Sequence, residues 1–326
     1  MEGINKLLYI QEKDDVADSQ DGNLDFINDW FLMGSGYNII LILVPYWLFV
    51  LKFGRNYMKN REPYKLTTLI TLYNAVQVII SCFLVYGATS MLNTYGYFPK
   101  TCVMETENRR RRLAALTYYY FLAKITELLD TIFFVLRKKE KQLSFLHIYH
   151  HSLMASVPWV IFKYEASYRL IFIGQLNSFV HVIMYTYYAL ASYPSLAKYL
   201  WWKKYITSMQ LIQFMTVFVH FIVSTKLSDC SISYTLTAAL FFHVFFFLYL
   251  FGKFYVDTYK KKQKSKSTEE VTQNGDIKQA VDDTDKQMYQ NGKINSVEGN
   301  GDCKSASINL NNTYRIKFNL ESKKRT

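Results

Sequence analysis

LSFLHIYHHSLMASVPWVIF, at residues 143–162, is apolar and long enough to cross a bilayer, yet it carries three histidines in its first half. His147 precedes His150 and His151 by three and four residues, so on a helix it lies one turn from both. Ionisable side chains in a membrane span are costly and usually face the protein interior. The segment therefore predicts a membrane helix whose histidines serve a buried site.

Apolar runs of about 20 residues recur on both sides of this stretch, up to residue 256. The fold class that they predict is an all-α polytopic membrane protein. Seven transmembrane helices are expected, at residues 31–52, 66–90, 113–136, 143–162, 167–191, 204–225 and 232–256. Residues 1–30 and 257–326 are polar, which predicts a lumenal N-terminal segment and a disordered cytosolic tail around a membrane domain at 31–256.

Basic clusters at the ends of the spans predict the orientation of the chain. Under the positive-inside rule they mark the cytosolic side, at residues 55–65, 137–141, 201–204 and 259–266. Arg109 to Arg112 fall on the lumenal side, and we interpret them as the solvent-exposed start of the third helix. Because the basic residues lie beside the spans, the net charge of +12 favours anionic head groups or a phosphorylated substrate over nucleic acid.

Two features of the loops and tail concern the cellular compartment. Cys102 and Cys230 fall in loops on the oxidising lumenal side, where they could form a disulfide or remain unpaired. The chain ends on KKRT, with Lys323 and Lys324 at the positions of a dilysine signal that returns membrane proteins to the endoplasmic reticulum. The sequence therefore predicts a multi-pass protein of that membrane with a cytosolic C-terminus.

Polar side chains recur on single faces of three other spans. They are Lys124, Glu127 and Asp130 in the third span, Asn177, His181, Tyr185 and Tyr188 in the fifth, and Gln210 and Gln213 in the sixth. At 1.5 Å per residue, Asp130, His181, Gln210 and Gln213 lie roughly 9–15 Å from the cytosolic ends, level with the histidines. This predicts a buried polar chamber that opens toward the cytosol. A Lys124–Glu127 salt bridge could instead only lock helices together, and His220 and His243 are interpreted as interhelical hydrogen bonds.

The histidine box could bind a metal or transfer an acyl group. Di-iron membrane enzymes need on the order of eight histidines, and this chain has 6. Adjacent His150 and His151 also diverge by about 100° on a helix, so we predict no metal. A neutral imidazole in an apolar chamber can instead attack an activated acyl group and pass it to a second nucleophile. A basic rim would meet a phosphorylated carrier, at Arg137, Lys138, Lys139, Lys203 and Lys204.

Four motifs in order resemble the signature of a known family. KITELLDT at 124–131, HIYHH at 147–151, NSFVHVIMYTYY at 177–188 and TSMQLIQF at 207–214 are similar to those of the very-long-chain fatty-acid elongases, the ELO family. The resemblance covers about residues 30–256. It implies seven helices in the endoplasmic-reticulum membrane, six of them enclosing an acyl tunnel and the first lying outside.

The resemblance also implies a reaction, in which a very-long-chain 3-oxoacyl-CoA synthase joins a long-chain acyl-CoA to the two-carbon unit of malonyl-CoA without a cofactor. His150 matches the acyl acceptor of a ping-pong cycle, and His181 matches the residue that assists malonyl decarboxylation. Supporting positions would be His147, His151, Asn177, Lys124, Glu127 and Asp130, with substrate contacts from Gln210, Gln213, Tyr185 and Tyr188. The implied partners are membrane lipid and the ketoacyl reductase, dehydratase and enoyl reductase of the elongation cycle.

Two other protein classes stay open on the residues alone. A metal-dependent lipid oxidase would contain stoichiometric iron in the active protein. A seven-span receptor would have the same orientation in the membrane, and full condensing activity in His150→Ala would favour it. The sequence does not give the preferred acyl chain length or the oligomeric state.

Overall fold

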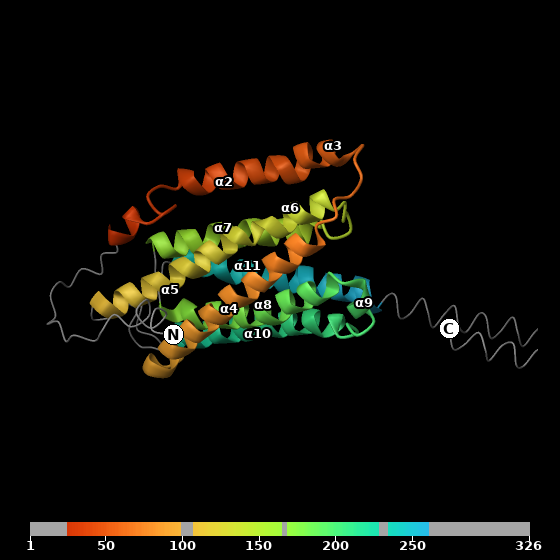
Figure 1. Ribbon diagram of the computed structural model, residues 1–326. Coiled ribbons are helices and arrows are strands. Elements are labelled where there is room, and N and C mark those ends of the chain that lie inside the picture. The colour runs from red at the N-terminus through yellow and green to blue at the C-terminus, as the bar shows by residue number, and fades with distance from the viewer. Residues whose placement is uncertain (1–24, 99–106, 165–167, 228–233, 261–326) are drawn as a thin grey trace, which may run out of the picture. The chain divides into compact units, whose positions relative to one another are not determined.

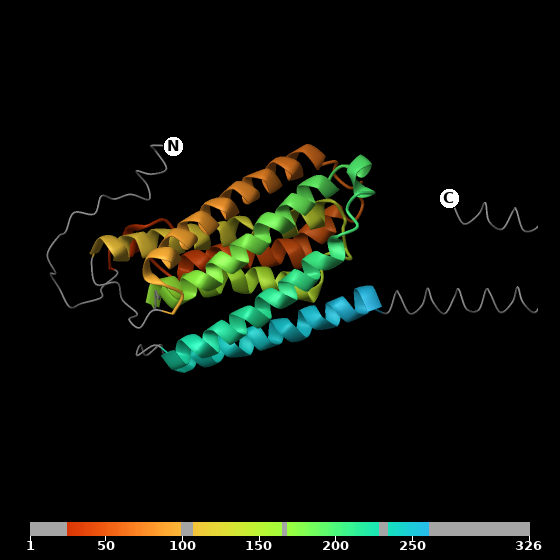
Figure 2. The same ribbon diagram turned by 90° about the horizontal axis from the view of Figure 1, so that it is seen from below.

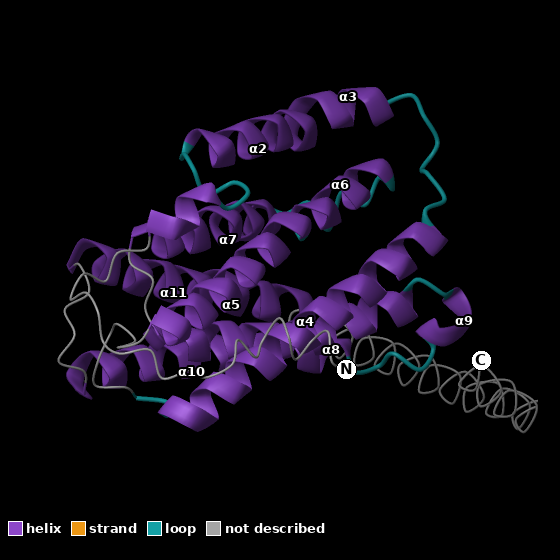
Figure 3. Ribbon diagram, turned by 60° about the vertical axis from the view of Figure 1, so that its left-hand side comes forward, coloured by secondary structure: helices purple, strands orange, loops and turns teal. Residues whose placement is uncertain are grey.

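The computed structural model describes residues 25–98, 107–164, 168–227 and 234–260, and every regular element in these ranges is a helix (Figure 3). Two predicted features, the polar N-terminal segment as far as residue 24 and the tail from residue 261, lie outside the described residues. So do both cysteines of the predicted disulfide and the C-terminal lysine pair.

The helices follow the predicted apolar runs. The first segment comprises α2 (Tyr37–Leu48), the π-helical turn η2 (Phe49–Phe53) and α3 (Gly54–Met58). It is followed by α4 (Thr67–Tyr95), α5 (Glu107–Thr126), α6 (Leu128–Leu136), α7 (Phe145–Tyr164) and α8 (Ile171–Ala191). The last are α9 (Pro194–Ala197), α10 (Lys203–Leu227), α11 (Tyr234–Tyr255) and the π-helical turn η4 (Val256–Lys260). Two 3₁₀ turns, η1 (Asp25–Asp29) and η3 (Tyr168–Leu170), precede α2 and α8.

Four of these segments are long and apolar enough to cross a membrane, at Tyr37–Met58, Thr67–Tyr95, Lys203–Leu227 and Tyr234–Tyr259. Their outward side chains agree with that role. Leu72, Ile79, Ile212 and Phe245 are between 63% and 68% exposed, as expected for surfaces that face lipid. The other three predicted spans coincide with α5–α6, α7 and α8, whose arginines, histidines and amides make them less apolar. The total of seven membrane crossings therefore stays a prediction.

Several helix boundaries differ from the prediction, and two of the differences affect the fold. The first helical segment continues to Met58, so that Arg55 belongs to a helix and not to the connecting loop. The third predicted span is two helices that meet at Glu127. Tyr73 of α4 donates its hydroxyl to the Thr126 carbonyl at 3.2 Å, and the Asp130 N–H bonds to the Glu127 carbonyl at 3.2 Å. In a continuous α-helix the Thr126 carbonyl would accept the Asp130 N–H. Here it accepts the Tyr73 hydroxyl of α4 instead, and the helix breaks.

The helices run along one common direction (Figure 1). Helix α4 packs along α8, α5 along α7, and α10 along α11, a pair that is seen side by side in Figure 2. The α2–α3 segment lies at the edge of this group (Figure 1), where it contacts α6 and α7. Its buried side chains Leu43, Tyr46 and Val50 join an apolar core with Leu128 of α6 and Ala155 of α7. The first helix therefore supports the histidine-bearing helix from outside.

The arginines at the start of α5 correct one prediction. Arg109, Arg110 and Arg112 are half-buried, and only Arg111 is exposed. The Arg109 guanidinium lies 5.3 Å from the Tyr95 ring centroid, and that of Arg111 lies 5.0 Å from the ring of Phe26. Aromatic faces stabilise these cations, so the run is packed against protein and is not simply solvated.

Candidate active site

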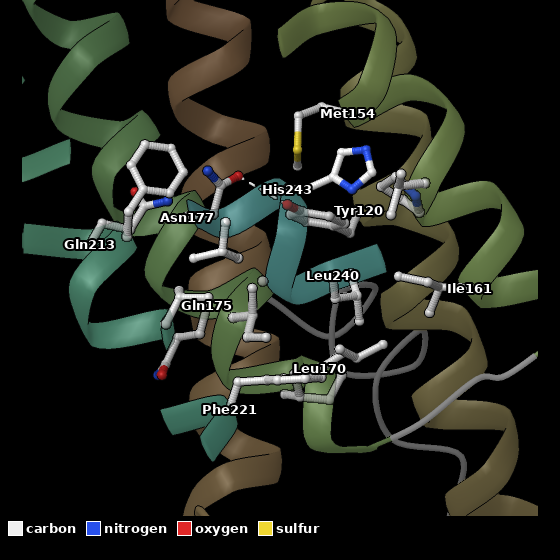
Figure 4. A pocket seen from close by; sticks show the side chains of 18 of the residues that line it. Tyr120, Met154, Ile161, Leu170, Gln175, Asn177, Gln213, Phe221, Leu240 and His243 are labelled. Carbon is white, nitrogen blue, oxygen red and sulfur yellow. Dashed lines mark hydrogen bonds between the residues drawn. The ribbon is translucent and has the colours of Figure 1, made fainter. Parts of the chain in front are cut away.

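An apolar cavity of about 210 Å³ runs between the helices (Figure 4). Its lining comes from six of the predicted spans, on α4, α5, α7, α8, α10 and α11. Among the described residues, none of the lining side chains comes from α2 or α3. On α7 the lining extends from His150 to Ile161, which at 1.5 Å per residue is roughly 16 Å. The cavity is therefore elongated along the helices.

Most of the polar lining lies toward one end of the cavity, with Gln175 nearer the other (Figure 4). Because successive long helices run in opposite directions, early residues of α7 and α10 lie level with late residues of α5 and α8. His150 and Tyr120 meet this condition, whereas Gln213 lies near the middle of α10 and Asn177 in the first half of α8; Figure 4 shows Tyr120, Asn177 and Gln213 around the same space. The opposite end is lined by apolar side chains, among them Ile161, Leu170, Phe221 and Leu236. Such a cavity suits a ligand with one reactive end and a long apolar chain.

A buried ionic cluster adjoins the polar end. Lys124 Nζ lies 2.8 Å from Glu127 Oε1, and His181 Nδ1 lies 3.0 Å from the same oxygen. Lys124 and Glu127 are 2% and 3% exposed, so the pair is removed from solvent. The second carboxylate oxygen, Glu127 Oε2, is buried without a hydrogen-bond partner among the described residues. The break between α5 and α6 places this carboxylate where it faces α8.

The hydrogen bonds around His181 define which ring nitrogen carries the proton. Its Nδ1 lies 3.0 Å from Glu127 Oε1, which can only accept, and 3.5 Å from Lys124 Nζ, which can only donate. The shorter contact assigns the Nδ1 proton to the bond with Glu127. Tyr120 donates its hydroxyl to Asn177 Oδ1 at 3.0 Å, so the Asn177 amide turns its N–H toward His181 Nε2, 3.5 Å away. His181 is thus a neutral imidazole with its Nε2 lone pair directed to the cavity-lining Asn177.

Asp130, the third of the predicted charged side chains, does not take part in this ion pair. It accepts a hydrogen bond from the Tyr185 hydroxyl at 2.7 Å, while the ion pair forms between the other two. Asp130 is 7% exposed and Tyr185 is completely buried. Tyr185 thus shares the face of Asn177 and His181, as the spacing predicted. Tyr188 lies one turn further on and is 37% exposed, with its ring 6.1 Å from that of Tyr185.

The box histidines have three different environments. His147 Nε2 lies 3.0 Å from Thr131 Oγ1, and the ring of His147 is 4.2 Å from that of His151 between centroids. His151 is 8% exposed and does not line the cavity. His150 lines the cavity and packs against Phe247 at 5.2 Å between ring centroids. Within the part of the chain that the structure describes, no hydrogen bond reaches the His150 ring.

The predicted substrate contacts are only partly brought together. Gln213 is buried at the cavity, whereas Gln210 donates a hydrogen bond to the Met184 sulfur at 3.7 Å and is absent from the lining. In the predicted basic rim, Lys139, Lys203 and Lys204 are exposed, and Arg137 and Lys138 are half-buried. Lys138 Nζ donates to the Lys59 carbonyl at 3.2 Å, so it also ties α6 to the end of α3.

Sequence reasoning missed several residues of the site. Tyr120 orients Asn177, Thr131 contacts His147, and Gln175 lines the cavity while bonding to Thr89 Oγ1 at 2.7 Å. The interpretation of His243 as an interhelical hydrogen bond is wrong, because its ring lines the cavity and its Nδ1 approaches a carbonyl of its own helix (Figure 4). His220 does bond outside its helix, with Nε2 3.2 Å from the Tyr97 carbonyl.

The described residues contain no group of three or more His, Cys, Asp or Glu side chains that could hold a metal ion. The ring planes of His150 and His151 are 86° apart, and His181 contacts a carboxylate that is paired with Lys124. What the arrangement offers is a cavity-facing imidazole beside a neutral, oriented histidine. Whether the reaction needs a metal or cofactor stays a prediction.

A helical membrane protein with a long apolar cavity that ends at buried histidines is the class that the fold and site define. The chain matches the ELO family, described as the GNS1/SUR4 family, over residues 31–267. It is 38% identical to very long chain fatty acid elongase 4 of Homo sapiens over 82% of this chain and 85% of that protein. It is 35% identical to very long chain fatty acid elongase 7 of Drosophila melanogaster over 90% and 93% of the two chains, respectively. The chain belongs to the ELO family.

Proposed function

We propose that this protein is the condensing enzyme of fatty-acid elongation, which converts a long-chain acyl-CoA and malonyl-CoA to 3-oxoacyl-CoA, carbon dioxide and CoA. The family and the names of its relatives make elongation of very-long-chain fatty acids the general activity. The elongated cavity would be the acyl tunnel, with the first helix outside it. The enzyme would act in the endoplasmic-reticulum membrane with its tail in the cytosol, without metal or cofactor, and would pass its product to a ketoacyl reductase.

The environment of His150 is the observation that carries this proposal. A nucleophile needs a free lone pair within reach of the substrate. In both other candidates the Nε2 lone pair faces a polar neighbour, because His147 Nε2 lies 3.0 Å from Thr131 Oγ1 and His181 Nε2 lies 3.5 Å from the Asn177 amide nitrogen. His150 alone of the three lines the cavity, and its ring is held by aromatic packing against Phe247 and Phe251.

In the first half of the cycle, a ring nitrogen of His150 attacks the thioester carbon of the acyl-CoA. The C–N bond forms, the C–S bond breaks, and the imidazole proton leaves with the thiolate as CoA-SH. The apolar lining keeps water from the acyl-imidazole, which would otherwise be hydrolysed.

In the second half, malonyl-CoA loses carbon dioxide and the resulting enolate attacks the acyl carbon. The new C–C bond replaces the C–N bond, and a proton from solvent restores the His150 imidazole. Asn177 lines the cavity, and its amide nitrogen lies 3.5 Å from Nε2 of His181, which is not itself part of the lining. An amide N–H of Asn177 can stabilise the enolate oxygen. Lys124 and Glu127 would fix His181 in the orientation that this step needs.

Incubation with stearoyl-CoA in the absence of malonyl-CoA tests the first half. Intact mass should rise by one acyl group, peptide mapping should place the group on His150, and hydroxylamine should remove it. The map is essential because Cys82 is a free thiol that could also be acylated.

His150→Ala should lose the adduct, and His220→Gln, which removes a buried imidazole outside the cavity lining, should keep it. An adduct that persists in His150→Ala would refute the assignment of the nucleophile. Stoichiometric iron in the active preparation would favour an oxidase instead.

A further inference from the structure

The helix at the edge of the bundle contributes one buried hydroxyl to the histidine box. Tyr46 of α2 is 5% exposed and donates its hydroxyl to Thr131 Oγ1 at 2.9 Å. Thr131 of α6 is completely buried, and its Oγ1 lies 3.0 Å from His147 Nε2. A continuous chain thus joins α2, α6 and α7. None of these three side chains lines the cavity among the described residues.

The number of protons available along this series of hydrogen bonds indicates the tautomer of His147. The Tyr46 hydroxyl has one proton, which it gives to Thr131. Thr131 then has one proton left to donate. Other threonines in these helices, such as Thr71 and Thr89, donate theirs to the carbonyl four residues earlier, at 2.9 and 2.7 Å. Thr131 Oγ1 instead lies 3.0 Å from His147 Nε2, and among the described residues it donates to no carbonyl. We therefore assign its proton to His147 Nε2, which then presents a lone pair while Nδ1 carries the hydrogen.

We propose that Tyr46 and Thr131 are positioning residues that hold His147 as the neutral Nδ1–H tautomer, so that a helix outside the cavity orients the catalytic box. The ring of His147 lies 4.2 Å from that of His151, which in turn lies 5.4 Å from that of His150. A rotation or protonation of His147 would therefore displace the rings that support the nucleophile. This inference rests on the proposed function for its catalytic consequence.

Three variants separate positioning from packing. Thr131→Val keeps the shape and removes the donor, Thr131→Ser keeps the donor, and Tyr46→Phe removes only the outer hydroxyl. Loss of one oriented hydrogen bond should slow acylation of His150 about tenfold in Thr131→Val and about threefold in Tyr46→Phe. Thr131→Ser should stay within about twofold of the parent protein. The KM for stearoyl-CoA should not change, because neither residue lines the cavity.

Tyr118→Phe is the matched control. Tyr118 packs against the same core, and its hydroxyl donates to the Phe31 carbonyl at 3.2 Å without contacting the histidines. It should acylate His150 at the parent rate. Equal slowing in Tyr118→Phe and Tyr46→Phe would show that the loss comes from general packing and would overturn the proposal.

The tautomer itself is measured without substrate. With 6 histidines in the chain, ¹⁵N-histidine labelling in lipid nanodiscs and assignment through His147→Gln give a tractable spectrum. His147 should show a protonated Nδ1 and an unprotonated Nε2 in the parent protein and lose this pattern in Thr131→Val. A protonated Nε2 in the parent protein would overturn the inference. Absence of any His150 adduct would instead overturn the proposed function, so the two failures are distinct. If Thr131→Val does not fold, the Tyr46→Phe and Thr131→Ser spectra decide.

Discussion

Neutralising Glu127 tests whether the buried ionic cluster is a working part of the site or a lock between helices. In Glu127→Gln the side chain keeps its size, but Lys124 loses its countercharge in a place where it is 2% exposed. Glu127 Oε1 lies 2.8 Å from Lys124 Nζ and 3.0 Å from His181 Nδ1, so one substitution weakens both contacts. The new amide N–H₂ would stand where Oε2 now has no partner in the described structure.

The expected loss follows from the burial of the pair. Removing one partner of a buried ion pair costs about 3–5 kcal/mol, because the remaining charge is left without compensation. Replacing both partners with neutral side chains of similar volume costs far less. For a domain of this size about 1 kcal/mol shifts Tm by roughly 2–4 °C, so Glu127→Gln should melt roughly 6–20 °C lower. The double variant Lys124→Met/Glu127→Gln should recover most of that loss.

Thermal unfolding followed by tryptophan fluorescence measures the change in Tm. Condensation of stearoyl-CoA with radiolabelled malonyl-CoA measures the enzymatic activity. If the pair only locks helices together, the double variant regains both Tm and activity. If it orients His181, the double variant regains Tm and stays at least about a hundredfold less active. Full activity in the double variant would refute our assignment. Glu62→Gln, at an exposed glutamate in the α3–α4 connection, should leave both quantities unchanged.

Three further predictions concern packing. In Gly87→Ala the new Cβ would lie 2.9 Å from Leu116 Cδ1, so the leucine should move into the cavity that it lines and shift products toward shorter chains in gas chromatography. Gly54→Ala would bring a Cβ to 2.9 Å from Val135 Cγ1 and should destabilise the α3–α6 contact by about 1–3 kcal/mol in thermal unfolding. Lys163→Met removes a donor that reaches the Met33 carbonyl at 2.7 Å, and it should lower Tm while leaving the acyl adduct per folded molecule unchanged. An unaltered product profile or melting temperature would contradict the respective contact.

Spacing along single helices predicted several of the buried polar side chains, although Tyr188 on the predicted face is 37% exposed. Asn177, His181 and Tyr185 recur at intervals of four, and all three are buried on the face that α8 turns toward α5 and α6. Lys124 and Glu127 are likewise buried and paired, as their cost in a membrane requires. Periodicity predicts which side chains share one face of a helix. The charged face turns toward the protein interior here because exposure of a charge to lipid is costly.

Contacts between helices could not be predicted from the sequence. The break at Glu127 depends on the Tyr73 hydroxyl, which reaches the Thr126 carbonyl from another helix. Nothing in the residues around Thr126 signals this, since neither glycine nor proline stands there. Tyr46 lies in an apolar run without polar neighbours, and its partner Thr131 lies 85 residues away. The hydrogen-bond partner of such a hydroxyl can be identified only when the packing of the two helices is known.

The three histidines of the box can be distinguished by their environments in the structure but not by their spacing in the sequence. His147, His150 and His151 belong to one motif and cannot be ranked by spacing, since all three lie within two turns. In the structure one is held by a threonine, one is packed away from the cavity, and one faces the cavity without a hydrogen bond from the described residues. A lone pair that already accepts a hydrogen bond is a poorer nucleophile, because the bond must break before attack. The polar neighbours of His147 and His181 therefore favour His150 as the proposed acyl acceptor, because its ring is the one of the three that the surrounding helices leave facing the cavity.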